Sequence, residues 1–153
     1  MSQKEFIRRK IAREVMRSAW IMFKNHLISW RTCLRITWKT VRFKADFIYT
    51  KVRGTTFGDR QDTLRKLSLF EPKNIELKLL RQADNPYDHN AVLVVASIQG
   101  VEEKDVGYLS KEISSWLSPI MDQGGGVVVL FSEVTGVKRE EGFLGMNLKF
   151  VLL

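Results

Sequence analysis

The sequence predicts a mainly β protein with helices, in which a small β-barrel of about six strands and two short helices follows an α-helical hairpin. Three observations predict this class. Two segments at the start repeat apolar residues every three or four positions, as amphipathic helices do. Short apolar or alternating segments follow, separated by turns that contain Gly, Asn or Pro. The 153 residues, 44% of them hydrophobic, are enough for one packed domain and an appendage.

The predicted hairpin covers residues 1–44 and precedes the barrel domain, residues 45–153. The apolar face of its first helix consists of Ile7, Ile11, Val15, Ala19 and Met22. We expect Asn25 and His26 to end that helix and Ser29 to cap the second one. The apolar face of the second helix consists of Trp30, Leu34, Trp38 and Val41.

The positive charge of the chain lies mostly in this hairpin. Residues 1–53 contain 14 basic and three acidic side chains, whereas residues 54–153 contain 11 and 14. The basic side chains form further helix faces, which consist of Arg9, Arg13, Arg17, Lys24, Arg31, Arg35, Lys39 and Arg42. This asymmetry indicates an anionic partner, such as DNA or a membrane surface. The other interpretation is that the basic faces are solvated and that the Trp residues form a core.

Strands and helices are predicted in turn after the hairpin. The predicted strands are residues 47–54, 74–82, 91–98, 106–110, 127–134 and 146–153. The two short helices are residues 59–69, capped near Asp62, and residues 111–121. We expect residues 99–105 to be a loop and the glycines at 124–126 to end the second short helix.

The sequence predicts neither a cofactor nor a metal site. Cys33 is the one cysteine, which excludes an internal disulfide and a multi-cysteine zinc site. His26 and His89 stand at no spacing typical of a metal site or a catalytic triad. No run approaches the roughly 18 apolar residues of a membrane span. The first residues also lack the apolar region of a signal peptide, so we expect a cytoplasmic protein.

The stretch RQADNPYDHNAVLVV, residues 81–95, raises the main functional question. We name residues 84–90 the NPYD loop. Asn-Pro begins turns, and Asp and Asn side chains bond to nearby backbone, so one interpretation is a turn that leads into a buried strand. That interpretation leaves unexplained why Tyr87 and Asp88 stand together at the tip.

The order of several motifs resembles the HIRAN domain. They are Gly54-Thr55-Thr56-Phe57, then NPYDHNAV at residues 85–92, then Val106-Gly107-Tyr108-Leu109 followed by Lys111-Glu112. The resemblance covers roughly residues 47–153. It implies an OB-like barrel that binds single-stranded DNA at a free 3′ end. HIRAN domains precede the motor of some DNA-remodelling helicases and also occur alone in bacterial and phage proteins.

The resemblance also implies the residues of the site. Tyr87 and Asp88 line the pocket for the terminal nucleotide, and aromatic side chains stack on bases. The implied DNA-binding residues are Phe57, Tyr87, Asp88, Tyr108, Phe143, Arg53 and Lys111. Thr56 stands where helicase-linked relatives can carry an arginine, which removes a phosphate contact. Arg53 or the basic hairpin is in a position to compensate for that loss.

We therefore expect a non-enzymatic module that recognises 3′-hydroxyl ends of single-stranded DNA, in DNA repair or in a mobile element. The hairpin adds phosphate contacts, to duplex DNA as well, or binds a protein partner. An alternative class is a protein-interaction or inhibitor module of a mobile element or phage, with Trp20, Trp30 and Trp38 as its docking surface. A weaker alternative is a metal-dependent nuclease.

The nuclease alternative depends on three residues. Asp62, Glu76 and Lys78 have the outline of a D…ExK site, in which carboxylates hold a metal near the scissile phosphate. A single ExK is ordinary by chance in a chain with 27% charged residues. The other interpretation is that Glu76 and Lys78 form the exposed face of an alternating strand.

Overall fold

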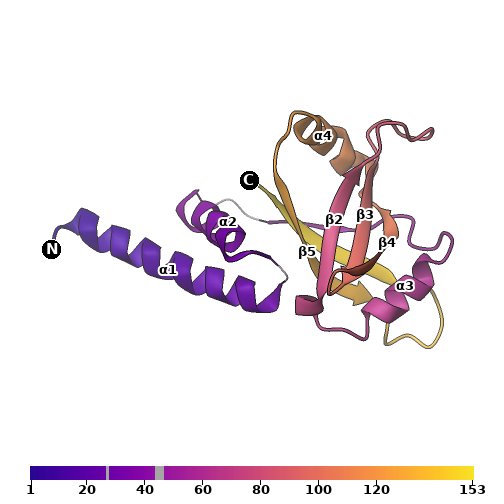
Figure 1. Cartoon of the computed structure of the whole chain (residues 1–153), viewed down its shortest axis with the longest axis horizontal. Coiled ribbons are helices and arrows are strands. Elements are labelled where there is room, and N and C mark those ends of the chain that lie inside the picture. Colours follow the sequence, from indigo (N-terminus) through magenta and orange to yellow (C-terminus); the bar gives the residue numbers. More distant parts are fainter. Residues whose placement is uncertain (27, 44–46) are drawn as a thin grey trace.

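The computed structural model describes residues 1–26, 28–43 and 47–153. The two predicted N-terminal helices are present as α1 (Gln3–Asn25) and α2 (Trp30–Phe43), which pack side by side as a hairpin. Ser29 caps α2 as predicted, because its Oγ accepts a hydrogen bond from the Thr32 N–H at 3.2 Å. The N-terminal end of α1 projects away from the rest of the molecule (Figure 1).

Small side chains allow the two helices to pack closely. Val15 and Ala19 of α1 are buried, and so are Cys33 and Thr37 of α2. Burial raises the pKa of the Cys33 thiol, which keeps it protonated and weakly nucleophilic. Cys33 therefore serves as a packing residue.

In the described parts of the chain, six β-strands form two antiparallel sheets of three strands each. The first sheet has the order β1 (Ile48–Lys51), β6 (Gly145–Leu152), β5 (Val127–Thr135). The second sheet has the order β2 (Ile75–Arg81), β3 (Val92–Ile98), β4 (Val101–Tyr108). The number of strands and the helical N-terminal part agree with the prediction.

The two sheets join just beyond the end of β1. The Val52 N–H still donates to Met146 O in the first sheet, at 2.9 Å. One residue later, Arg53 and Tyr108 exchange two backbone hydrogen bonds of 2.7 and 2.8 Å, which connects the chain to β4 in the second sheet. On the opposite side β2 packs against β5, but no ladder joins these two among the described strands. The result is a barrel with one open seam.

The main core lies between the two sheets. Its largest fully buried strand residues are Met146, Leu148, Phe150, Val92, Val94 and Val106. Two short helices contribute further residues: Leu64 and Leu67 come from α3 (Arg60–Leu67), and Leu117 comes from α4 (Lys111–Asp122). A 3-10 turn, η1 (Pro72–Asn74), leads into β2.

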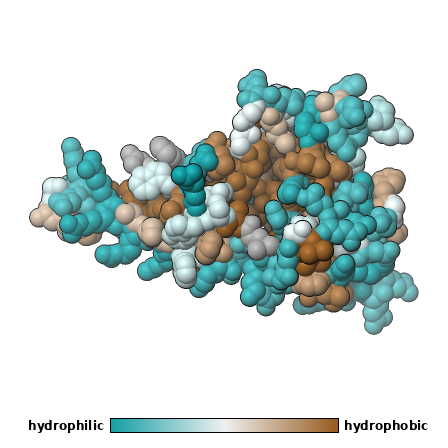
Figure 2. All heavy atoms as spheres, viewed as in Figure 1, coloured by the Kyte–Doolittle hydropathy of each residue, from teal (hydrophilic) through white to brown (hydrophobic). Residues whose placement is uncertain are grey.

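The hairpin docks on the outer face of the first sheet. Leu130 and Val151 are each next in sequence to a core phenylalanine, and neighbouring side chains of a strand point to opposite faces. They therefore point away from the main core, yet they are only 4% and 3% exposed. Ile28, in the connection between α1 and α2, lines one groove with Leu130. Lys39 Nζ donates to the Leu152 carbonyl at 2.7 Å. Figure 2 shows hydrophobic residues continuing from the hairpin onto the barrel.

Two of the differences from the predicted bounds change the interpretation of a segment. Residues 99–105 are not a loop, because β4 begins at Val101 after a two-residue turn in which Gln99 and Gly100 have φ of 52° and 73°. The charged residues that indicated a loop lie instead on a solvent-facing strand, where charge discourages unwanted pairing. The helix predicted to be capped near Asp62 is α3, and its N-cap residue is Asp59 instead. Asp62 lies in the first turn of α3 and forms an ion pair with Arg65.

Candidate nucleic-acid interface

The NPYD loop connects β2 to β3 and is ordered by its own side chains. Asn85 Oδ1 accepts hydrogen bonds from the N–H groups of Tyr87 and Asp88, at 2.9 and 3.2 Å. Asp88 Oδ1 in turn accepts from the Asn90 N–H at 2.9 Å. These are the short-range bonds by which Asn and Asp fix turns. The loop is therefore a shaped turn with Tyr87 at its tip.

Hydrogen bonds at the base of the loop connect it to the second sheet. Tyr108 Oη donates to Gln82 Oε1 at 2.8 Å, and Asn85 Nδ2 donates to the same oxygen at 3.2 Å. The Gln82 N–H bonds to Ala91 O at 2.9 Å, which closes the loop. Ser118 Oγ of α4 donates to Asn90 Oδ1 at 3.1 Å. The loop is thus fixed from β2, β4 and α4 together.

A cavity of about 490 Å³, which we name the NPYD pocket, opens beside this loop. The residues that line it are Arg53, Gly54, Phe57, Arg60, Asn85, Pro86, Tyr87, Asp88, Ala91, Tyr108, Leu109, Ser110 and Lys111. Six of the seven residues predicted for DNA binding are among them. The seventh, Phe143, lies on the β5–β6 connection, is 67% exposed, and is not part of this lining.

Two aromatic side chains of the pocket are largely exposed to solvent. Tyr87 is 90% exposed and Phe57 is 69% exposed. Leaving large aromatic surface in water forgoes the stabilisation that burial would give. Packing does not explain these two side chains, whereas contact with a ligand would.

Arg60 forms one wall of the pocket, although it is not among the residues predicted from the sequence. Its Nε is 2.8 Å from Asp105 Oδ2, and one terminal nitrogen donates to Gly54 O at 2.8 Å. Its guanidinium carbon also lies 5.4 Å from the centre of the Tyr108 ring. A cation in the first turn of a helix opposes the helix dipole, so this position was itself a sign of a tertiary role.

The remaining charged groups surround the opening. Arg53 and Lys111 are exposed cations, and Asp88 is a half-buried carboxylate. The first turn of α4 is at the pocket, and Ser110 caps it by accepting from the Ile113 N–H at 3.3 Å. Helix N-termini attract anions. The pocket therefore combines one carboxylate with a cationic rim.

Gly107 allows the strands beside the pocket to approach closely. A Cβ at this position would lie 2.2 Å from Arg53 O and 2.6 Å from a Val52 methyl carbon. Its φ of 150° is also one that other residues rarely adopt. The glycine therefore permits the backbone bonds between Arg53 and Tyr108 that join the sheets.

Comparison with known proteins identifies the family of this chain. The family model of the HIRAN domain matches residues 47–152. The chain belongs to the HIRAN domain family. HIRAN domains are in general DNA-binding modules that recognise DNA 3′ ends, and they typically bind rather than catalyse. A search of curated proteins finds no match.

Two solved structures are similar to this HIRAN protein. A crystal structure of a protein from Lactobacillus plantarum is 20% identical, with a TM-score of 0.47, over 69% of this chain and 95% of the other. The crystal structure of the HIRAN domain of human HLTF is 24% identical, with a TM-score of 0.45, over 69% of this chain and 74% of the other.

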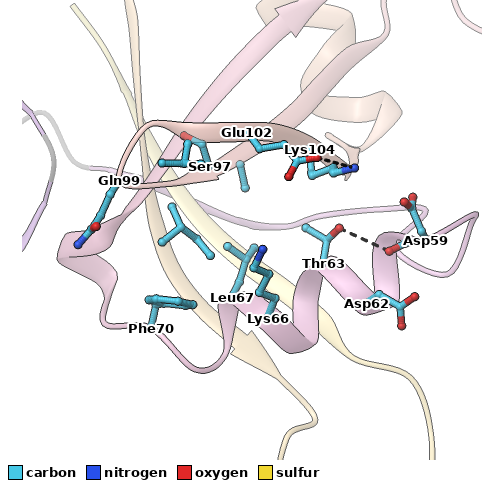
Figure 3. Close-up of a pocket in the computed structure, with 13 residues that line it drawn as sticks. Asp59, Asp62, Thr63, Lys66, Leu67, Phe70, Ser97, Gln99, Glu102 and Lys104 are labelled. Carbon is cyan, nitrogen blue, oxygen red and sulfur yellow. Dashed lines mark hydrogen bonds and ion pairs between the residues drawn. The ribbon is translucent and has the colours of Figure 1, made fainter.

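A second cavity, of about 460 Å³, lies between α3 and the β3–β4 hairpin (Figure 3). Phe70 stands at one end of it, and Asp59 and Asp62 stand at the other. Glu76 and Lys78, the other two residues of the ExK outline, line a different groove between β2 and β5. The structure therefore does not bring the three residues of that outline into one cavity.

Lys78 forms an ion pair with Glu103 of β4, which raises the pKa of its ammonium group. Among residues 1–26, 28–43 and 47–153 no cluster of three or more His, Cys, Asp or Glu side chains is placed to hold a metal ion. No helix in the described parts of the chain is long and apolar enough to cross a membrane.

Proposed function

We propose that the NPYD pocket binds the 3′-hydroxyl end of single-stranded DNA. The observation that carries the proposal is the composition of the pocket: a half-buried carboxylate, Asp88, shares it with two exposed aromatics, Phe57 and Tyr87. Arg53 and Lys111 add positive charge at the opening. Each group has a separate task in end recognition.

Asp88 selects the end of the strand. A free 3′ hydroxyl donates a hydrogen bond, and an ionised carboxylate is a strong acceptor. Asp88 Oδ1 is engaged by the Asn90 N–H, and a carboxylate has further lone pairs for a ligand. An internal nucleotide has a phosphodiester at the same oxygen, which has no proton to donate and brings negative charge against Asp88.

Phe57 and Tyr87 supply affinity without sequence preference. Stacking of a base on an aromatic side chain contributes roughly 1–3 kcal/mol, whichever base is present. The Asn85 bonds and Pro86 restrict the backbone beside Tyr87 before any ligand arrives. Little conformational entropy is then lost on binding.

We assign contact with the phosphate groups of the bound strand to two cations, Arg53 and Lys111. Arg60 is less suited, because its side chain is only 13% exposed and its guanidinium already bonds Asp105 and Gly54. Arg53 therefore compensates for Thr56, which lacks the charge. The exposed basic residues of the hairpin add contacts to phosphates farther from the end.

One observation favours a protein-interaction function for the hairpin. An apolar groove across α1 and α2 is lined by Ala12, Val15, Met16, Leu34, Arg35 and Trp38. Trp20 beside it is 53% exposed and packs edge-on against Trp30 with ring centres 6.2 Å apart. If this groove binds a protein partner and not DNA, replacement of Met16 and Trp20 by polar residues should leave DNA affinity unchanged.

Oligonucleotides that differ only at their ends test the proposal. Fluorescence anisotropy compares matched single strands that carry a 3′ hydroxyl, carry a 3′ phosphate, or are circular. The strand with a 3′ hydroxyl should bind more tightly than the strand with a 3′ phosphate by about 1.5–3 kcal/mol, which is the contribution of a hydrogen bond to a charged group. Equal affinity for all three strands would contradict end recognition.

Two substitutions in the same loop sharpen this test. Asp88→Asn removes the charge but keeps an oxygen for the Asn90 N–H, so the turn is retained and the preference for the hydroxyl should shrink. Asp84→Asn is the matched control, because Asp84 is an exposed carboxylate of the NPYD loop that does not line the pocket. If both variants behaved like wild type, Asp88 would not be the acceptor.

A further inference from the structure

The outer face of β1 and of the residues that flank it carries two aromatic and then two basic side chains, and this row leads to the NPYD pocket. Side chains alternate along a strand, so Phe47, Tyr49, Lys51 and Arg53 share one side. The intervening Val52 points into the core and is 2% exposed. Arg53 belongs both to this row and to the pocket lining. The row therefore begins at the edge of the pocket.

Lys149 of β6 connects the aromatic residues of the row. It stands opposite Tyr49 in the sheet register. Its Nζ lies 5.0 Å from the centre of the Phe47 ring and 5.9 Å from that of Tyr49. Tyr49 nevertheless remains 69% exposed. Its ring is positioned by the neighbouring cation and still presents most of its surface to solvent.

The charge of this face is mainly positive. Lys51, Arg53 and Lys149 are its cations, and one acid, Glu133 of β5, stands in the same row as Lys51 and Asn147. Glu133 accepts a hydrogen bond from Asn147 Nδ2 at 3.1 Å. Asn147 separates Glu133 from Lys51 in this row, and Lys149 stands in the row of Tyr49, so the cations lie nearer to β1 than the carboxylate does.

We propose that this face is a track for the nucleotides that precede the terminal one. The proposal rests on the end-binding pocket proposed above. Proteins that bind single strands combine a positive groove along the backbone with aromatic rings on which bases stack, and this row has both. Side chains two residues apart on a strand stand roughly 6.6 Å apart, so the row repeats at a spacing similar to that of an extended nucleotide chain. Tyr49 stacks on a base, and Lys51 and Lys149 contact phosphates.

The dependence of affinity on oligonucleotide length tests the track separately from the pocket. The probes are oligothymidylates with a 3′ hydroxyl, one of about three nucleotides that fills the pocket and one of about ten. For wild type the longer probe should bind tighter. Tyr49→Ala should weaken binding of the longer probe by roughly 5- to 150-fold, the range for loss of one base–aromatic stack, and leave the short probe unchanged. Tyr49→Phe should retain both affinities.

Charge is tested in the same way. Lys149→Gln should lower the dependence of log affinity on log salt by about 0.7 for the long probe, the value for one phosphate contact on a single strand. Lys66→Gln on α3, an exposed lysine that lies outside the row, should not change it. A photoreactive base near the 3′ end of the long probe should crosslink to Tyr49 in wild type.

The outcomes separate the two proposals. If the short probe binds but the long probe gains nothing, or if Tyr49→Ala weakens both probes equally, the track is overturned and the pocket stands. Crosslinking of the photoreactive base only to other parts of the chain would also overturn the track. If neither probe binds wild type, the pocket itself is wrong, and the track falls with it.

Discussion

Replacement of Asn85 separates the shape of the NPYD loop from its chemistry. Asn85→Ala removes the acceptor for two backbone N–H groups, those of Tyr87 and Asp88, and the donor to Gln82. A neutral hydrogen bond contributes about 0.5–1.5 kcal/mol net. The loop is exposed, so water replaces part of this, and we expect the ordered conformation to lose about 1–2 kcal/mol.

That loss should appear in affinity more than in global stability. If the ligand binds the ordered loop, the free energy of reordering is subtracted from binding, and Kd rises by about 5- to 30-fold. Asn85→Asp is a partial control, because its carboxylate still accepts from both N–H groups but lacks the donor to Gln82 and adds negative charge to the pocket. The change in Kd is measured by anisotropy with a 3′-hydroxyl single strand, and loop order by amide hydrogen exchange at Tyr87 and Asp88.

The two measurements together decide the question. Faster exchange with weaker binding in the alanine variant is the expected result. If exchange at Tyr87 and Asp88 became faster while Kd stayed the same, the ordered loop would not be the binding form. The assignment of the site to the NPYD loop would then be wrong.

Three further predictions concern Arg60, His26 and the basic hairpin. Arg60→Met removes an ion pair and a hydrogen bond to Gly54 O, so unfolding free energy should fall by about 2–3 kcal/mol and the melting temperature by several degrees. Burial, with a smaller effect of Lys149, lowers the pKa of His26 below 6.5, so the unfolded chain takes up the proton more readily. Stability should therefore fall as pH drops through 6.5, and His26→Gln should flatten that dependence in denaturant titrations. Arg13→Gln combined with Arg17→Gln should lower the salt dependence of DNA binding by up to about 0.7 per lost contact on single strands, and an unchanged slope would assign the hairpin to another partner.

The elements could be predicted from the sequence because their signals are local. Apolar residues at three- and four-residue steps marked α1 and α2, and alternation marked β2. Residues 101–105 were misjudged, because a run of charges is typical of a loop as well as of an exposed edge strand. The positive φ angles of Gln99 and Gly100 form the tight turn that makes this segment a strand and not a loop. The residue types at these two positions do not determine those angles.

Six of the residues that line the pocket were named from the order of motifs, whereas the bonds that support the pocket were not. Gln82 and Tyr108 are 26 residues apart, and Arg60 and Asp105 are 45 apart, so no local pattern reveals their bonds. Phe143, which does not line the pocket, stands in a part of the sequence with few recognisable motifs. It lies on a connection whose path depends on neighbouring strands.

The close approach at Gly107 has a consequence for the interpretation of sequence motifs. The backbone of Arg53 occupies the space that any side chain at 107 would need, whether or not a nucleic acid is bound. A homologue that had lost DNA binding would therefore still require glycine here to keep its two sheets together. The presence of this glycine is therefore evidence for the fold and not for DNA binding. Loss of function would show first at Phe57 and Tyr87, whose exposed rings could change without cost to folding.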